Sequence, residues 1–204
     1  MTETPANPPA APVPNLNIAN VLTTLRIIMV PFFVWALVAD ESAYGWMRWV
    51  AVAIFAVAMY TDKLDGDLAR SRGLITNFGK IADPIADKLL TGSALVMFSI
   101  LAELPWWITI VILVREWGIT LIRFVVIRYG VMAASRGGKL KTVLQTAAIL
   151  LYLLPVTHTI AWLGIAAFIV MLLALAITVI TGLDYLIKAW ALRASATSGN
   201  APRS

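Results

Sequence analysis

Residues 46–101 read WMRWVAVAIFAVAMYTDKLDGDLARSRGLITNFGKIADPIADKLLTGSALVMFSIL. The stretch holds two apolar runs, near 46–65 and 82–101, joined by a charged segment. Each run has about 20 residues, the length of helix that crosses the hydrocarbon core of a bilayer. Acidic side chains inside or beside a membrane span are costly and usually functional. The stretch therefore predicts two membrane-spanning helices with a charged site at one membrane surface.

The composition of the whole chain also indicates a membrane protein. Of the 204 residues, 60% are hydrophobic and 13% are charged, and the mean hydropathy is +0.85. Soluble globular proteins are roughly half apolar and a quarter charged. The net charge of +5 is scattered among apolar runs, which suits anionic lipid headgroups better than nucleic acid. The chain has no cysteine, so disulfides and thiolate chemistry are excluded.

We expect an all-α integral membrane protein with about six transmembrane helices. The other apolar runs lie near 26–39, 105–127, 142–158 and 161–187. Residues 15–25 mix aliphatic side chains with Asn and Thr at helical spacing, which predicts a short interfacial amphipathic helix before the first span. Residues 1–14, with five prolines, and residues 194–204 are predicted to be disordered tails. Residues 15–193, between the two tails, are predicted to form one membrane domain.

The charges of the loops predict the orientation. The connections near 66–81 and 128–141 carry the basic residues Arg70, Arg72, Lys80, Arg128, Arg136, Lys139 and Lys141. The opposite connections carry Asp40, Glu41, Glu103 and His158. Because basic loops stay in the cytoplasm, both termini and the charged site are expected on the cytoplasmic side. His158 is then expected to be exposed in an outer loop, and Trp106, Trp107, Trp162 and Trp190 to be interfacial anchors.

Four aspartates flank the first basic loop at helical spacing. Asp62 and Asp65 are three residues apart, and Asp83 and Asp87 are four apart, so each pair shares one face of its helix. Two antiparallel helices would bring the four carboxylates together, and divalent cations would relieve their repulsion. Ligation by oxygen alone favours Mg²⁺ or Mn²⁺ over zinc. The alternative is a set of salt bridges with neighbouring Lys and Arg, and Asp67 is expected to be solvated.

Small and basic residues accompany the aspartates. Gly66 and Ala69 leave the helix surface bare for a ligand, and Arg70 and Lys63 can bind phosphate oxygens. The run matches the pattern D-x2-D-G-x2-A-R-x8-G-x3-D-x3-D at every fixed position. This pattern is the signature of the CDP-alcohol phosphotransferases, a family that the chain therefore resembles.

The resemblance implies a fold, a reaction and a set of site residues. The fold is a six-helix membrane homodimer whose polar cavity faces the cytoplasm. In the reaction, an acceptor hydroxyl attacks the β-phosphoryl group of CDP-diacylglycerol, and CMP leaves. Asp62, Asp65 and Asp83 are implied to bind one or two divalent ions, with Asp87 as both a ligand and the general base. The implied CDP-diacylglycerol site comprises Asn20, Thr23, Asp62, Gly66, Ala69, Arg70, Thr76 and Gly79.

Charged residues in the second half of the chain bear on the acceptor. Arg115, Glu116 and Arg123 lie in a predicted span, where they cannot face lipid cheaply. With Lys139 and Lys141, the two arginines predict a site for an acceptor that carries its own phosphate. The alternative is that Glu116 simply neutralises an arginine. For Asn20, likewise, capping a helix is an alternative to binding the cytidine.

Short patches outside the aspartate run narrow the resemblance to one branch of the family. Asn20–Arg26, Asp83–Lys88, Arg115-Glu116 and Gly138–Thr142 with Gln145 resemble bacterial phosphatidylglycerophosphate synthases. That resemblance implies glycerol 3-phosphate as the acceptor, in phospholipid biosynthesis at a bacterial cell (inner) membrane. Phosphatidylinositol-phosphate synthases are the nearest alternative. A divalent-metal transporter is an alternative of another class, but the acids cluster near one face and no inverted repeat is present.

Overall fold

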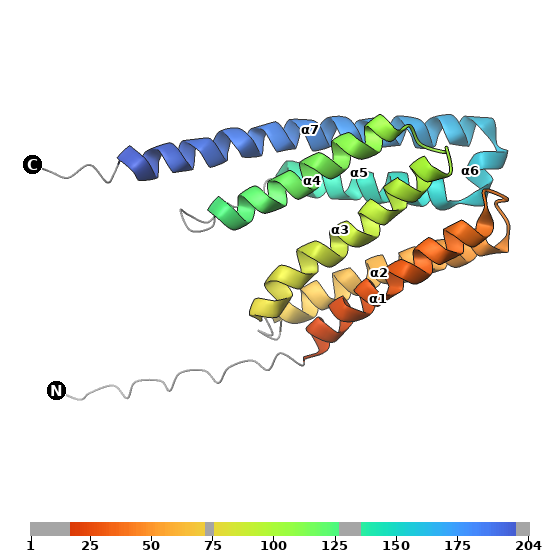
Figure 1. The fold of residues 1–204 in the computed structure, drawn as a ribbon, viewed down its shortest axis with the longest axis horizontal. Helices are drawn as coiled ribbons and strands as arrows, with labels where there is room; N and C mark the ends of the chain where they lie inside the picture. The colour runs from red at the N-terminus through yellow and green to blue at the C-terminus, as the bar shows by residue number, and fades with distance from the viewer. Residues whose placement is uncertain (1–16, 72–75, 127–135, 199–204) are drawn as a thin grey trace, which may run out of the picture.

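The computed structural model describes residues 17–71, 76–126 and 136–198 (Figure 1). Within these ranges, the structure describes only the backbone at residues 69, 70, 77, 80, 123–126, 136 and 191–198. Every described element is a helix. The helices are α1 (Ile18–Asp40), α2 (Trp46–Ser71), α3 (Asn77–Ile100), α4 (Trp106–Val126), α5 (Arg136–Leu153), α6 (Pro155–Thr159) and α7 (Ala161–Ser198).

The predicted all-α class is confirmed, and each of the six long helices overlaps one of the six predicted apolar runs. Two of the described helices, α1 and the Ala161–Trp190 part of α7, are long and apolar enough to cross a membrane by length and composition. Helix α7 also includes 194–198, the first residues of the predicted C-terminal tail. The tail residues 1–14 and 199–204 lie outside the described residues.

The separate interfacial helix predicted over 15–25 is wrong, because α1 is continuous from Ile18 to Asp40. Asn17 caps this helix by accepting a hydrogen bond from the Asn20 backbone N–H at 3.0 Å. No glycine or proline interrupts the chain between the cap and Pro31, which lies inside the helix. The capping role considered for the Asn20 side chain therefore belongs to Asn17.

The fifth predicted span, 142–158, is also divided differently in the structure. Helix α5 begins at Arg136 and ends at Leu153, and the short α6 starts at Pro155. Proline has no backbone N–H to continue the hydrogen-bond ladder of α5, but it suits the first turn of a new helix. The remaining apolar residues up to Thr159 therefore form a separate turn before α7.

The helices pack as two groups, α1 with α2 and α3, and α7 with α4 and α5 (Figure 1). Contacts of α3 with α4 and α5, and of α2 with α5, join the two groups. The start of α1, the end of α2, the start of α3 and the end of α7 lie at one end of the bundle, called here the aspartate end. The other end, called the far end, holds residues 41–45, residues 101–105 and α6.

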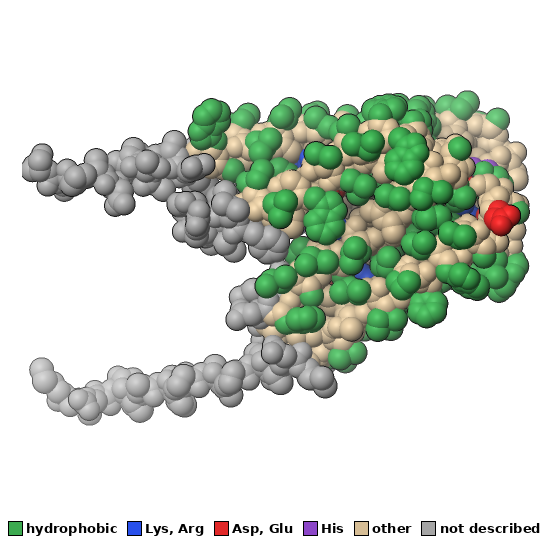
Figure 2. All heavy atoms as spheres, in the orientation of Figure 1, with side chains coloured by type: hydrophobic (Ala, Val, Ile, Leu, Met, Phe, Trp, Pro, Cys, Tyr) green, Lys and Arg blue, Asp and Glu red, His purple; other side chains and the backbone are tan. Residues whose placement is uncertain are grey.

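An apolar core and an apolar surface both characterise the bundle. The core includes Phe33, Phe55, Phe98 and Ile149. Figure 2 shows hydrophobic side chains spread along the helices on the face in view, and the predicted anchors Trp106, Trp107, Trp162 and Trp190 are all exposed. A surface of this kind suits contact with lipid, since soluble monomers rarely expose large contiguous apolar patches.

Candidate active site

A polar stripe on α1 faces the aspartate end of the bundle. Asn20, Thr23 and Arg26 recur at every third position and are 5%, 1% and 0% exposed. Further along the same helix the buried positions from Phe33 to Leu37 are apolar, and the helix ends at the buried Asp40. Buried polar groups need partners, and all three residues find theirs on α2, on α3 or at the cap of α3. Helix α1 therefore forms one wall of the aspartate site.

Arg26 holds the two aspartates of α2. Its Nη1 lies 2.6 Å from Asp62 Oδ1, and its Nη2 lies 2.5 Å from Asp65 Oδ2. The Asp65 side chain is 5% exposed, whereas that of Asp62 is 39% exposed. Arg26 belongs to a patch that carries the family resemblance, but no role for it was predicted from the sequence. A cation at the edge of an apolar run was the available signal, because such a charge needs a partner.

Thr23 joins the aspartates of α2 to those of α3. Its hydroxyl donates to Asp83 Oδ1 at 2.6 Å and lies 3.3 Å from Asp65 Oδ2. The carboxylates of two different helices thus approach one oxygen atom. Asp62 also lies within electrostatic reach of Asp65, Asp83 and Asp87. The structure therefore brings Asp65 and Asp83 together at Thr23, with Asp62 and Asp87 within electrostatic reach.

The oxygen donors of this site suit a hard divalent cation. In the described part of the chain, no three acidic or histidine side chains lie close enough together to form a ready-made metal site. Arg26 supplies positive charge to Asp62 and Asp65 instead. However, the shared approach of Asp65 and Asp83 to Thr23 shows that α2 and α3 present oxygen ligands toward one point. Oxygen ligands alone are what Mg²⁺ and Mn²⁺ prefer.

Thr76, Gly79 and Asn20 form a second contact between α1 and α3. Thr76 caps α3, with its Oγ1 accepting from the Gly79 N–H at 3.0 Å and from Asn20 Nδ2 at 2.9 Å. A Cβ atom at position 79 would lie 2.9 Å from Asn20 Oδ1, closer than unbonded atoms normally approach. Glycine is therefore required for the Asn20 amide to reach α3 beside Asp83.

The other residues of the predicted CDP-diacylglycerol site are less fully defined. Gly66 is half-buried on α2, one position after Asp65, and Lys63 and Asp67 are exposed nearby. The side chains of Ala69, Arg70 and Arg123 lie outside the described residues.

A second charged cluster centres on the buried Glu116 of α4. Its carboxylate lies 2.6 Å from Lys141 Nζ, 2.8 Å from Arg115 Nη1 and 3.8 Å from Lys88 Nζ. The alternative that Glu116 neutralises an arginine is confirmed, but it contacts two lysines as well. Three cations around one anion leave a net positive charge in a partly desolvated place, where an anionic ligand is favoured. Lys88 was not predicted to join this cluster, although it directly follows Asp87 in the sequence.

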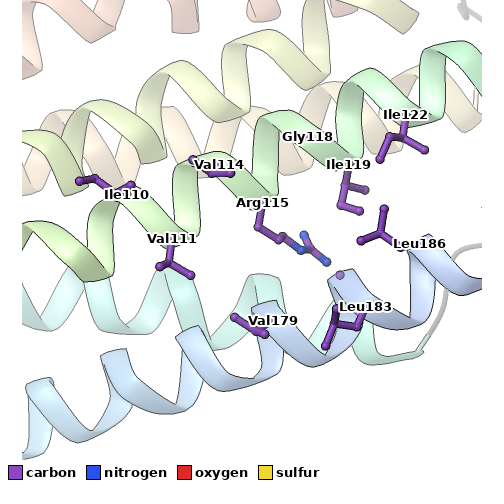
Figure 3. A pocket seen from close by; sticks show the side chains of 11 residues that line it. Ile110, Val111, Val114, Arg115, Gly118, Ile119, Ile122, Val179, Leu183 and Leu186 are labelled. Carbon is purple, nitrogen blue, oxygen red and sulfur yellow. The ribbon is translucent and has the colours of Figure 1, made fainter.

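The predicted acceptor residues Arg115, Lys139 and Lys141 do not all meet. Lys139 is exposed at the start of α5. Arg115 points from α4 toward α7, where its Nη2 donates to Thr181 Oγ1 at 2.8 Å. There it borders a cavity of about 480 Å³ whose other lining residues are apolar or glycine (Figure 3). Arg115 therefore lies at the edge of an apolar cavity, and its contact with Glu116 makes it part of the cluster of cations around that residue. This cluster of Lys88, Arg115 and Lys141 is called here the basic cluster.

Asp87 lies between the two charged clusters. It acts electrostatically on Asp62 of the aspartate site and on Lys141 of the basic cluster. Among the described residues, no hydrogen bond or ion pair engages its carboxylate. A carboxylate of this kind is available to an incoming ligand, because no protein group already occupies its oxygen atoms.

A buried ion cluster also occupies the far end, and it includes His158. The expectation that His158 is exposed is wrong, since its side chain is 15% exposed. Its ring stacks on Tyr44 at 4.1 Å between centroids, and its Nε2 lies 2.8 Å from the Tyr152 carbonyl oxygen. Burial, followed by the charge of Glu103, raises the pKa of the Tyr44 phenol. His158 lies at the opposite end of the bundle from the aspartates.

Comparison with known proteins places these residues in a family. A family model described as CDP-alcohol phosphatidyltransferase matches residues 16–181. A probable phosphatidylglycerophosphate synthase of Mycobacterium tuberculosis is 52% identical over 173 residues, covering 85% of this chain and 81% of that protein. A CDP-diacylglycerol–glycerol-3-phosphate 3-phosphatidyltransferase of Bacillus subtilis is 35% identical over 193 residues, covering 85% of this chain and 95% of that protein. An enzyme of the same name from Rickettsia felis is 34% identical over 174 residues, covering 83% and 93%.

Proposed function

The chain belongs to the CDP-alcohol phosphatidyltransferase family, and we propose that it transfers the phosphatidyl group of CDP-diacylglycerol to a hydroxyl of glycerol 3-phosphate. The products are phosphatidylglycerophosphate and CMP. The names of the relatives from Mycobacterium tuberculosis and Bacillus subtilis support this acceptor. The reaction would serve phospholipid biosynthesis.

The position of Asp87 is the structural observation that carries the proposal. The enzyme must bring an activated phosphoryl group and an anionic acceptor to one general base. Asp87 lies within electrostatic reach of Asp62 on one side and of Lys141 on the other. A carboxylate placed between the two binding regions can take a proton from an acceptor hydroxyl bound there.

The proposed chemistry assigns a task to each group of residues. Asn20, Thr23, Thr76 and Gly79 hold the cytidine diphosphate part of the donor against α1 and α3. The basic cluster, with Lys141 at its centre, holds the phosphate of the acceptor. Asp87 takes the proton as the hydroxyl oxygen bonds to the β-phosphorus, and the bond from that phosphorus to the oxygen of CMP breaks. Arg26 keeps Asp62 and Asp65 oriented toward the site.

Divalent ions complete the proposed site. Mg²⁺ or Mn²⁺ would be held by Asp62, Asp65, Asp83 and Asp87 and would supply charge neutralisation for the diphosphate. The fit of the oxygen donors supports this part of the proposal, together with the family resemblance.

We also propose that the six long helices cross a bacterial cell membrane, with the aspartate end toward the cytoplasm. Lys63, Lys88, Lys139, Lys141 and Lys188 lie in the halves of the helices nearest this end. The described charges at the far end are Asp40, Glu41, Arg48, Glu103 and His158. Basic residues concentrate on the cytoplasmic side of membrane proteins. A homodimer is proposed on the family resemblance.

An acceptor assay tests the proposed reaction. Purified protein in detergent is given CDP-diacylglycerol and Mg²⁺ with either glycerol 3-phosphate or inositol phosphate, and CMP release and the lipid product are measured. We expect phosphatidylglycerophosphate only when donor, glycerol 3-phosphate and Mg²⁺ are all present. Product formation with inositol phosphate but not with glycerol 3-phosphate would reassign the chain to the sister activity.

Variants of the basic residues test the acceptor site. Arg115→Ala and Lys141→Ala should each raise the KM for glycerol 3-phosphate roughly tenfold, because each removes a cation of the cluster around Glu116 that is proposed to hold its phosphate. The KM for CDP-diacylglycerol should change little. Lys188→Ala is the matched control, since Lys188 pairs with Asp184 on the exposed surface of α7. An unchanged KM for glycerol 3-phosphate in both variants would remove these residues from the acceptor site.

A further inference from the structure

Within the part of the chain that the structure describes, Gln145 on α5 is buried without a hydrogen-bond partner for its amide oxygen. The residue is 4% exposed, and its Oε1 is shielded from solvent and accepts no hydrogen bond from the described residues. Buried amides are almost always hydrogen-bonded, because desolvating them without a partner is costly. A leucine or methionine would fill the same space at less cost. An amide kept at such a position indicates a partner that binds from outside the chain.

The location of Gln145 connects it with the acceptor site. It lies four residues after Lys141, so the two side chains share one face of α5. Lys141 contacts Glu116 and lies within electrostatic reach of Asp87. Helices α3 and α5 touch and run in the same direction, from the aspartate end to the far end (Figure 1).

Three kinds of group therefore occur near one another: a cation at Lys141, a general base at Asp87 and a neutral amide at Gln145. Glycerol 3-phosphate carries three matching groups, namely a phosphate, a terminal hydroxyl that reacts, and a middle hydroxyl that does not. With the phosphate at Lys141 and the reacting hydroxyl at Asp87, the middle hydroxyl needs a neutral hydrogen-bonding partner.

We propose that Gln145 is this partner, with its Oε1 accepting a hydrogen bond from the middle hydroxyl of the acceptor. Gln145 is then a specificity-determining residue that selects a phosphorylated acceptor with a hydroxyl next to the one that reacts. The inference rests on the proposed function and adds the residue that recognises the middle hydroxyl of the acceptor. Sites built around a buried polar group discriminate strongly against a ligand that leaves it unpaired.

The test combines a substitution with an acceptor analogue. Gln145→Leu is compared with the unmodified enzyme on glycerol 3-phosphate and on 3-hydroxypropyl phosphate, which lacks the middle hydroxyl. The unmodified enzyme should prefer glycerol 3-phosphate by roughly tenfold or more in kcat/KM. Gln145→Leu should lose this preference, mainly through a higher KM for glycerol 3-phosphate. Its melting temperature in detergent should stay equal or rise, because an unpaired buried amide has been replaced by an apolar group of similar size.

Control variants and opposing outcomes make the test decisive. Thr142→Val, on an exposed position of α5, should change neither the preference nor the stability. If Gln145→Leu does not fold, Gln145→Met, which is unbranched and of similar length, decides instead. Retained preference in the folded variant, or an equal loss of activity on both acceptors together with lower stability, would overturn the inference. Failure of the unmodified enzyme to use glycerol 3-phosphate at all would overturn the proposed function itself.

Discussion

The two ends of the bundle each bury an arginine completely, yet they surround it differently. At the far end, Arg48 pairs with Glu103 at 2.5 Å and lies 4.0 Å from Asp40. It also donates to the carbonyl oxygens of Leu153 at 3.2 Å and Tyr152 at 2.9 Å. Both acidic side chains are almost fully buried, at 3% and 1% exposed. The cluster is closed, and it ties the start of α2 to the end of α5.

At the aspartate end, the described partners of Arg26 are carboxylates, with no backbone carbonyl among them. Both arginines have a buried guanidinium nitrogen without a hydrogen-bond partner among the described residues, but at this end one ion-pair partner, Asp62, is 39% exposed. An ion pair that stays partly open to solvent can exchange a partner, whereas a fully enclosed one can only hold elements together. In this protein, a buried charge therefore indicates a functional site only where its ion-pair partners remain accessible to solvent.

The largest effect is expected at Asp87. Asp87→Asn removes the proposed proton acceptor while keeping the shape of the side chain, and should lower turnover about 10²–10⁴-fold, the usual contribution of a general base. Binding of CDP-diacylglycerol and the melting temperature should change little. Asp67→Asn, at an exposed position of the same charged segment, is the matched control. Near-normal turnover of Asp87→Asn would exclude this residue as the base.

The next effect tests the closed end. Arg48→Met should lower the free energy of unfolding by about 3–5 kcal/mol, because Glu103 is left as a buried charge without its main partner. The kcat of the folded fraction should be unchanged, since Arg48 lies at the far end. Denaturant unfolding in detergent and activity per folded molecule measure the two quantities. A loss of kcat without a loss of stability would show that the far end takes part in the chemistry.

Arg26→Met should destabilise the protein by a similar amount, about 3–5 kcal/mol, because Asp65 is left as a buried charge although water can still reach Asp62. Unlike the Arg48 variant, it should regain much of its melting temperature when Mg²⁺ is added, since a divalent cation can replace the lost charge beside Asp62 and Asp65. Arg26→Lys keeps the positive charge, so its melting temperature without Mg²⁺ should lie between those of the unmodified protein and Arg26→Met. Equal Mg²⁺ responses of Arg26→Met and Arg48→Met would contradict the distinction between an open and a closed cluster.

Much of the fold and of the aspartate site could be predicted because its information is local. Apolar runs of membrane-spanning length gave the six long helices, and spacings of three and four residues put Asp62 with Asp65 and Asp83 with Asp87. The pattern also identified the family before any geometry was known. These features depend on periodicity within one helix, which the sequence displays directly.

The missed features depend on packing between distant segments. Arg26 meets Asp62 and Asp65 only because α1 packs along α2, and nothing local to Arg26 names its partners. Likewise, the contact of Asn20 with Thr76 spans 56 positions of sequence. His158 was expected to be exposed because its loop position is polar, but stacking on Tyr44 depends on how α6 folds back.

The smallest effect is expected at His158, and it tests whether the far end is purely structural. His158→Phe keeps a ring to stack on Tyr44 but loses the hydrogen bond to the Tyr152 carbonyl, and His158→Gln keeps a donor but loses the ring. Each should cost about 1 kcal/mol of unfolding free energy, the size of one hydrogen bond or one aromatic contact. The KM values for both substrates should not move, because His158 and the aspartates lie at opposite ends. A changed KM in either variant would mean that the closed cluster is coupled to the open one.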